Sequence, residues 1–152
     1  MRLSIVAVGR ARDGPEGALC RGYLARLPWD VRVVEVEAKG RASGAAELKR
    51  REAELLLDAT PERAVVVALD EAGKSLSSAA FAERMGRWIE DGAELAFVLG
   101  GADGLDESVR RRASLLLSLG PMTWPHLLAR ALLAEQLWRA HSILSGHPYH
   151  RA

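Results

Sequence analysis

Short apolar runs alternate with amphipathic stretches along the whole chain. Five runs are short and apolar enough to predict buried strands, at residues 3–8, 31–37, 64–69, 94–99 and 115–119. Between them, apolar residues recur every three or four positions, as in helices that cover one face of a sheet. Because strands and helices alternate with short connections, the pattern predicts an α/β domain with a parallel sheet flanked by helices.

Capping residues and stop signals set the limits of the predicted helices. Proline suits the first turn of a helix, serine and aspartate cap its first amide groups, and glycine or proline ends it. We therefore expect helices from Pro15 to Pro28, from Ser43 to Ala59, from Ser77 or Ser78 to Gly92, from Asp106 over Arg110, Arg111 and Arg112, and from Pro125 to about Leu144. Residues 70–76 are predicted to form a loop. The apolar surface of the last helix is wider than one stripe, which predicts burial on more than one side.

Three predicted strands end in bends that are candidates for a binding site. The strand 94–99 stops at Gly100 and Gly101, the strand 115–119 stops at Gly120, and the strand 64–69 stops at Asp70. Ligands of parallel sheets bind at the carboxyl ends of the strands. We expect these bends to form one binding floor, in which glycine lets backbone N–H groups approach the ligand.

Composition limits the class of protein. The 152 residues are 49% hydrophobic and 27% charged, which predicts one globular domain over 1–152. No apolar run reaches membrane-spanning length, the N-terminus lacks the features of a signal peptide, and the single Cys20 suits a reducing compartment, so we expect a cytoplasmic protein. The net charge of +1 disfavours coating of nucleic acid by bulk charge and leaves room for a local basic patch.

Several apparent motifs fail when their spacing is checked. A dinucleotide-binding G-x-G-x-x-G needs glycine where Leu99 stands, and a P-loop ending in Gly73-Lys74-Ser75 needs glycine where Ala68 stands. His147 and His150 lack the further ligands of a zinc site, so no metal is expected.

The C-terminal end concentrates the titratable chemistry, since all four histidines lie between His126 and His150. Tyr149, His150 and Arg151 combine a stacking ring, an imidazole and a fixed cation, which suits a grip on a base and a phosphate; a frayed terminus is the alternative. His126 begins the last helix, where either a capping or a functional role is open.

Taken in order, the motifs resemble the RlmH (YbeA) family of SPOUT-class RNA methyltransferases. The resemblance covers the whole chain and is carried by Gly73-Lys74 with Ser77-Ser78 and Phe81, Leu99-Gly100-Gly101-x-x-Gly104-Leu105, Met122-Thr123-Trp124-Pro125-His126 with Arg130, Glu135-Gln136-Leu137-Trp138-Arg139-Ala140, and the closing Tyr149-His150-Arg151. One departure is Leu127, where the family often has proline or glutamine.

The resemblance implies a SPOUT fold with a trefoil knot near the C-terminus and a homodimer formed through the last helix. It implies transfer of a methyl group from S-adenosyl-L-methionine to N3 of a pseudouridine in 23S (large-subunit) ribosomal RNA, on the assembled ribosome. The cofactor residues would be Leu69, Gly100, Gly101, Leu119, Gly120, Pro121, Met122, Thr123 and Trp124.

The resemblance also implies that Tyr149, His150 and Arg151 complete a site near the dimer interface. We hypothesise that His150 or a water accepts the N3 proton, and that Arg130 or Arg151 stabilises the negative charge on the ring. Phosphates would be held by Arg151, Arg110, Arg111, Arg112 and Lys74. The alternatives are a non-catalytic α/β dimer that binds RNA or a nucleotide, a small-molecule methyltransferase, and a P-loop enzyme, which Ala68 disfavours.

Overall fold

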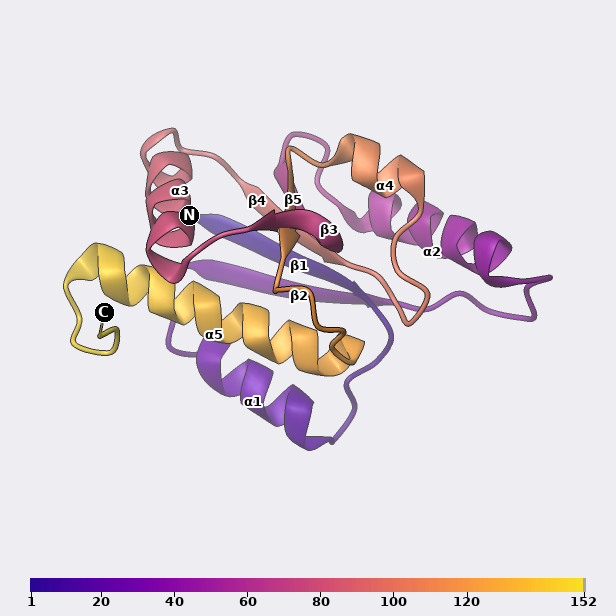
Figure 1. Ribbon diagram of the computed structural model, residues 1–152, viewed down its shortest axis with the longest axis horizontal. Coiled ribbons are helices and arrows are strands. Elements are labelled where there is room, and N and C mark those ends of the chain that lie inside the picture. The colour runs from indigo at the N-terminus through magenta and orange to yellow at the C-terminus, as the bar shows by residue number, and fades with distance from the viewer. Residues whose placement is uncertain (152) are drawn as a thin grey trace.

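A five-stranded parallel sheet in the order β2-β1-β4-β3-β5 runs through the centre of the molecule (Figure 1). The computed structural model describes residues 1–151. The strands are β1 (Arg2–Val8), β2 (Asp30–Val36), β3 (Val65–Ser75), β4 (Leu95–Leu99) and β5 (Leu115–Ser118). The helices are α1 (Pro15–Leu24), α2 (Ala45–Ala59), α3 (Ser78–Glu90), α4 (Glu107–Arg112) and α5 (His126–Ser145). The predicted alternation of strands and helices is therefore confirmed.

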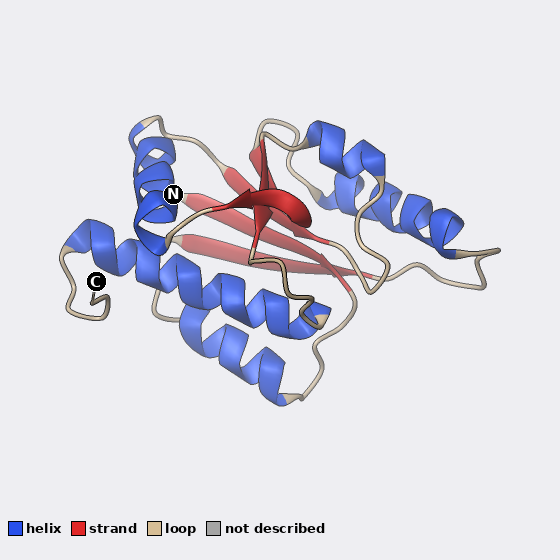
Figure 2. Ribbon diagram, in the orientation of Figure 1, coloured by secondary structure: helices blue, strands red, loops and turns tan. Residues whose placement is uncertain are grey.

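Helices cover both faces of the sheet (Figure 2). Alternate residues of each strand point to opposite faces, so the sheet divides the core into two parts. One part packs against α3 and α5 and contains Leu3, Ile5, Phe97, Met85, Leu133 and Leu137. The other packs against α2 and α4 and contains Val6, Val66, Val98, Leu56 and Val109. Burial on both faces explains why the central strands are almost continuously apolar.

The capping residues of two helices are confirmed and that of a third is wrong. Ser77 accepts a hydrogen bond from the Ala80 amide at 3.1 Å, and Asp106 accepts one from the Ser108 amide at 3.0 Å. Gly44, and not Ser43, is the N-cap of α2. The amide of Ser43 instead donates to the Glu47 carboxylate one turn into the helix, so an acidic side chain meets the exposed amide groups.

The largest departure from the predicted elements is in β3. Residues 70–75, expected in a loop, continue this strand to Ser75 after an irregularity. Leu69 and Lys74 both pair with Leu117 of β5, so the chain bulges outward between them and then returns (Figure 1). Polar residues hide this strand in the sequence, because the returning segment is largely exposed. The trefoil knot stays a prediction.

Helix α5 packs on more than one side, as its wide apolar surface predicts. It contacts α1 on one side and α3 on another, and it covers the sheet through Leu133 and Leu137. Gly146, with φ of +72°, ends the helix in the left-handed conformation. Within residues 1–151, no helix combines the length and the apolar character needed to span a membrane.

Candidate active site

A cavity of about 840 Å³ opens where the three bends meet at the carboxyl edge of the sheet. Its walls come from the turn after Leu69, from the loop between β4 and α4, and from the segment between β5 and α5. The structure therefore brings the three predicted bends together. All the predicted cofactor residues except Pro121 line this cavity: Leu69, Gly100, Gly101, Leu119, Gly120, Met122, Thr123 and Trp124.

The glycines of the β4–α4 loop have a structural reason besides the expected approach of backbone amides to a ligand. A Cβ at Gly100 would lie 2.7 Å from the carbonyl oxygen of Gly104, and one at Gly101 would lie 3.0 Å from the Glu52 carboxylate and 3.1 Å from Val8. These glycines allow the loop to close on itself and against the sheet. Gly104, with φ of +84°, also needs the freedom of a residue without Cβ.

Glu52 of α2 lies directly under this loop. It is 7% exposed, and its Oε1 atom is buried without a hydrogen-bond partner in the described residues. Burial, with the nearby charge of Asp103, raises the pKa of the Glu52 carboxyl. A protonated, neutral carboxyl is therefore favoured at this position beneath the cavity floor.

Two basic residues on the helices α2 and α4 also line the cavity. Neither is among the cofactor residues expected from the sequence. They are Lys49 of α2 and Arg110 of α4. Arg110 pairs with Asp70 at 3.2 Å and with Glu107 at 3.8 Å. Arg110 is expected from the sequence only as a phosphate ligand. Sequence spacing could not place either residue at this cavity, because the sheet topology brings α2 and α4 to this edge.

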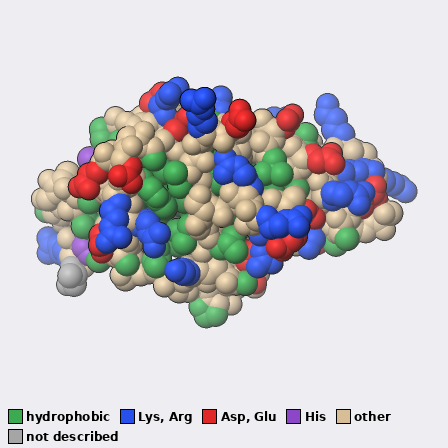
Figure 3. Space-filling model, turned by 90° about the horizontal axis from the view of Figure 1, so that it is seen from above, with side chains coloured by type: hydrophobic (Ala, Val, Ile, Leu, Met, Phe, Trp, Pro, Cys, Tyr) green, Lys and Arg blue, Asp and Glu red, His purple; other side chains and the backbone are tan. Residues whose placement is uncertain are grey.

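The other predicted phosphate ligands differ in how free they are. Arg112 donates to the backbone oxygens of Glu62 and Ala64, at 2.9 and 3.1 Å, so it is tied to the fold. Arg111 and Lys74 are exposed. Basic side chains, mixed with acidic ones, gather over α2 and α4 (Figure 3). A mixed surface of this kind offers phosphate contacts without a strong overall positive field.

Arg130 is placed beneath the end of β1 and does not line the cavity. It is 3% exposed, bonds Glu35 Oε2 at 2.5 Å, and donates to the carbonyl oxygens of Val8 and Gly9 at 3.3 and 3.1 Å. Burial alone would raise the pKa of Glu35, but hydrogen bonds from the Ala11 amide and from Arg130 outweigh it and lower the pKa. In this chain the two terminal nitrogens of Arg130 therefore hold the β1–α1 turn.

His126, one turn before Arg130, does line the cavity. A Cβ at Gly9, where φ is +92°, would lie 3.0 Å from its Nε2 atom. The buried Arg130 thus fixes the turn against which this histidine packs.

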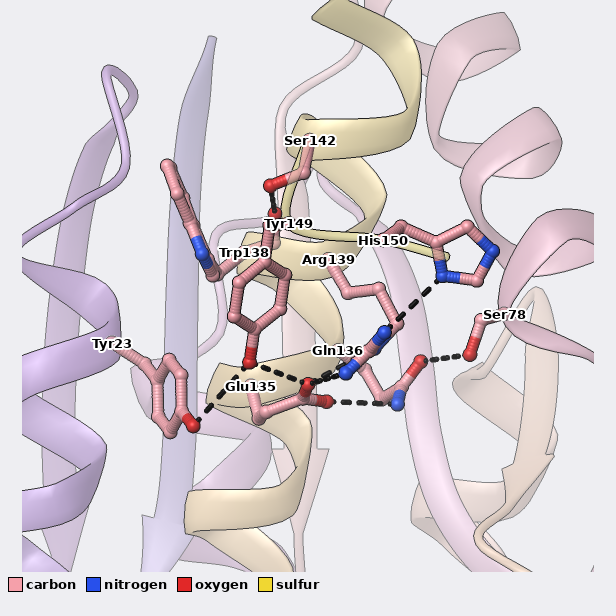
Figure 4. A network of polar contacts seen from close by, with 9 residues as sticks. All are labelled: Tyr23, Ser78, Glu135, Gln136, Trp138, Arg139, Ser142, Tyr149 and His150. Atoms are coloured by element: carbon pink, nitrogen blue, oxygen red, sulfur yellow. Dashed lines mark hydrogen bonds and ion pairs between the residues drawn. The ribbon is translucent and has the colours of Figure 1, made fainter. Parts of the chain in front are cut away.

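The C-terminal tail lies at the other end of α5 and folds back on that helix (Figures 1 and 4). The hydroxyl of Tyr149 donates to Glu135 Oε1 at 2.9 Å and lies 3.4 Å from the hydroxyl of Tyr23. His150 is held by Arg139, and Arg151 is exposed. Burial, together with the bonds to Tyr23 and Glu135, raises the pKa of Tyr149, so its hydroxyl stays protonated.

None of the three tail residues lines the cavity, because the tail folds onto the middle and second half of α5. Tyr149 contacts Glu135 and His150 contacts Arg139, which at 1.5 Å per residue lie about 14 and 20 Å along the axis from His126 at the start of the helix. The structure therefore does not bring the two groups of predicted site residues together within one chain. Within residues 1–151, no three or more His, Cys, Asp or Glu residues form a group suited to a metal ion.

Comparisons with known proteins agree with this architecture. A family model described as a predicted SPOUT methyltransferase matches residues 1–150. The ribosomal RNA large subunit methyltransferase H of Rhodospirillum centenum is 60% identical over 153 residues, covering 100% of both chains.

Two solved structures share the fold at low sequence identity. A probable methylase family protein from Haemophilus influenzae matches 99% of this chain and 70% of its own, with a TM-score of 0.60 and 13% identity. The SpoU methyltransferase AviRb from Streptomyces viridochromogenes, in complex with the cofactor AdoMet, matches 95% of this chain and 58% of its own, with a TM-score of 0.50 and 14% identity.

Proposed function

Since the chain belongs to the SPOUT methyltransferase family, we propose that it methylates large-subunit ribosomal RNA with S-adenosylmethionine as the methyl donor. The finer proposal is that the target is N3 of a pseudouridine on the assembled ribosome. The observation that carries the proposal is the cavity formed by the three bends, in a chain 60% identical to a ribosomal RNA large subunit methyltransferase H.

The walls of the cavity suit a donor that has both an apolar ring and charged groups. Its volume of about 840 Å³ lies within the range of small-ligand pockets. Leu69, Leu119 and Met122 offer apolar surface, and the bends offer backbone amide and carbonyl groups for the edge of an adenine. The carboxylate of Asp70 and the ammonium of Lys49 provide both signs of charge at the same walls.

The chemistry asks the protein mainly for positioning. When bound, S-adenosylmethionine supplies a methyl group that is already activated by its sulfonium. The residues of this chain then have to orient the base, exclude competing nucleophiles and stabilise the negative charge left on a uracil-type ring when N3 loses its proton. Tyr149, His150 and Arg151 are our candidates for the contacts to the base and its phosphate, and Arg130 is the candidate for holding the cavity wall in place.

We propose that these tail residues act on the cavity of a second copy of the chain. In one chain about 14 to 20 Å of helix lies between the start of α5 and the residues that hold the tail, and no tail residue lines the cavity. Each tail would therefore act on the cavity of a partner whose α5 runs antiparallel. Exposed apolar side chains lie at both ends of α5: Met122 (71%) and Trp124 (41%) near its start, and Leu144 (44%) near its end. In a two-fold dimer these surfaces would face each other, and each copy would complete the site of the other.

The charge distribution favours a structured substrate over free RNA. Basic residues near the cavity are interleaved with acidic partners, as Arg110 is with Asp70 and Glu107. Phosphate attraction is therefore local, and affinity for a flexible strand should be modest. An assembled ribosome adds surface and shape that such a protein can recognise.

The proposal is tested by calorimetry with S-adenosylmethionine and by transfer of a labelled methyl group to ribosomes lacking the modification and to free large-subunit RNA. We expect heat of binding with the donor and label that enters large-subunit RNA of the ribosome in preference to free RNA. Mapping of the labelled nucleotide then tests the pseudouridine assignment.

The alternatives give other results in the same assays. A binding module without chemistry gives no heat with the donor and no label in RNA. A small-molecule methyltransferase binds the donor and leaves both RNA substrates unlabelled. Either result would contradict the proposed function.

A further inference from the structure

Arg139 connects the tail to helix α5 through a contact that the proposed function does not use. Its Nη1 atom lies 3.2 Å from Nδ1 of His150, and its guanidinium lies over the Tyr149 ring with 4.9 Å to the centroid (Figure 4). Among the described residues, hydrogen bonds reach the His150 ring only at Nδ1. The Nε2 side of the half-buried ring is therefore left for another molecule.

Glu135 holds Arg139 in this position. Its Oε1 atom accepts from Arg139 Nε at 2.9 Å and Nη2 at 2.5 Å, and from the Tyr149 hydroxyl at 2.9 Å. Its Oε2 atom accepts from Gln136 at 2.9 Å, and Gln136 in turn accepts from Ser78 of α3 at 2.7 Å. The guanidinium is thus fixed on one side by a fully engaged carboxylate, and its remaining arm points to the imidazole.

This contact determines which nitrogen of His150 carries the proton. A guanidinium has only donors, so the Nδ1 atom facing it has to be the acceptor. The hydrogen bonds that Arg139 donates to Glu135 raise the pKa of Arg139, so the guanidinium stays charged and keeps donating. The neutral ring then carries its hydrogen on Nε2, because the bond made at one ring nitrogen decides the state of the other.

We propose that Arg139 is a positioning residue that holds neutral His150 with its hydrogen on Nε2, so that His150 donates a hydrogen bond to the substrate base and does not accept its proton. This inference rests on the proposed function and changes the role first hypothesised for His150. The lone pair able to take a proton is at Nδ1, and Arg139 occupies it. The proton of N3 leaves to water, and the Nε2–H group stabilises the negative charge on a ring carbonyl oxygen.

The tautomer is measured by nitrogen NMR on protein labelled with ¹⁵N-histidine, at a pH where the rings are neutral. The chain has four histidines. The signals that disappear in the His150→Gln variant are those of His150. We expect a protonated Nε2 and an unprotonated Nδ1 for His150 in the full chain. A protonated Nδ1, or a mixture of both tautomers, would overturn the inference.

Two substitutions test whether Arg139 is the cause. Arg139→Met removes the donor, so we expect both tautomers to appear and methyl transfer to fall about 10- to 100-fold through lost orientation. Arg139→Lys keeps a donor and should restore the Nε2 tautomer and part of the activity. The control is Arg87→Met, which removes an arginine from the same Glu-to-Arg i,i+4 arrangement, Glu83 with Arg87, on α3. It should change neither readout.

The outcomes separate this inference from the function on which it rests. If the tautomer of His150 is unchanged in Arg139→Met, the positioning role of Arg139 is wrong, whatever the rate of methyl transfer. A wild-type chain with the expected tautomer but no methyl transfer would overturn the proposed function, while the spectrum would still support the arrangement of Arg139 and His150.

Discussion

At the scale of single residues, Glu52 is an ionisable group whose burial acts against the folded state. Burial and Asp103 raise its pKa, so the folded chain holds this proton to a higher pH than the unfolded chain does. Between the ordinary carboxyl pKa, about 4.3, and the raised value, the folded state binds more protons. The free energy of unfolding therefore falls as the pH rises through this window.

Glu52→Gln cannot ionise, so it should be more stable than the wild type at pH 8. The difference in the free energy of unfolding should shrink as the pH falls below about 4, where the wild-type carboxyl becomes protonated in both states. Urea denaturation across this pH range measures it. Glu54→Gln, on the exposed face of the same helix, is the matched control and should show little change; a stabilisation of Glu52→Gln independent of pH would contradict the account.

Arg130 illustrates a residue whose importance can be predicted while its role cannot. Arg130→Met removes the guanidinium that donates to Glu35 and to two backbone oxygens, which should cost about 1 to 3 kcal/mol because these groups are partly or fully buried. Urea denaturation gives this value. The exposed pair Glu83–Arg87 is the comparison, since Arg87→Met should cost less than about 0.5 kcal/mol. Equal losses would show that the buried pair does not support the fold.

Residue chemistry could be predicted where it depends on neighbours in sequence. Ser77 and Asp106 cap helices through amide groups two or three residues away. The sequence therefore identifies Asp106 and leaves only Ser77 or Ser78 for the other cap. Lys49, Glu52 and Arg139 depend on elements that meet only in the folded chain. Their roles were out of reach of any local pattern.

At the scale of elements, the return of β3 over β5 depends on one glycine. A Cβ at Gly73 would lie 2.5 Å from the carbonyl oxygen of Leu116, so Gly73→Ala should force the strands apart at a cost of about 2 kcal/mol or more. Since β5 leads into the cavity wall, affinity for the methyl donor should fall as well. Thermal unfolding and calorimetry measure the two effects.

The control for this substitution is Gly22→Ala in helix α1. No atom lies within 4 Å of the added Cβ there, and alanine favours a helix by up to about 1 kcal/mol over glycine. Gly22→Ala should therefore be neutral or stabilising. A neutral Gly73→Ala would contradict the close approach of β3 and β5.

The second part of β3, residues 70–75, was not predicted from the sequence. Apolar runs predict buried strands such as β4, and a spacing of three or four residues between apolar positions predicts amphipathic helices. Residues 70–75 are mainly polar or small and lie at the surface, where pairing with β5 rather than burial decides their conformation. A strand held by backbone pairing alone leaves no hydrophobic pattern to read.

At the scale of the whole molecule, the predicted site residues form two separate groups. One group lines the cavity at the start of α5, and the other, the tail, packs on the middle and second half of that helix. The three bends could be assigned to one site from sequence, because the carboxyl ends of parallel strands share an edge. The separation of tail and cavity could not, since it follows from how α5 is docked between α1 and α3. The two-fold dimer that we propose would resolve the separation by letting each chain complete the site of the other.

The most direct test of this account is to mix two variants that are each inactive. Thr123→Trp blocks the cavity from an exposed wall position, and His150→Ala removes the tail contact while leaving donor binding intact. After subunit exchange, half of the dimers pair one variant with the other and hold one intact site. We predict about a quarter of the wild-type methyl transfer. If the mixture stays as inactive as each variant alone, the tail does not act on the cavity of a partner chain, and the account is wrong.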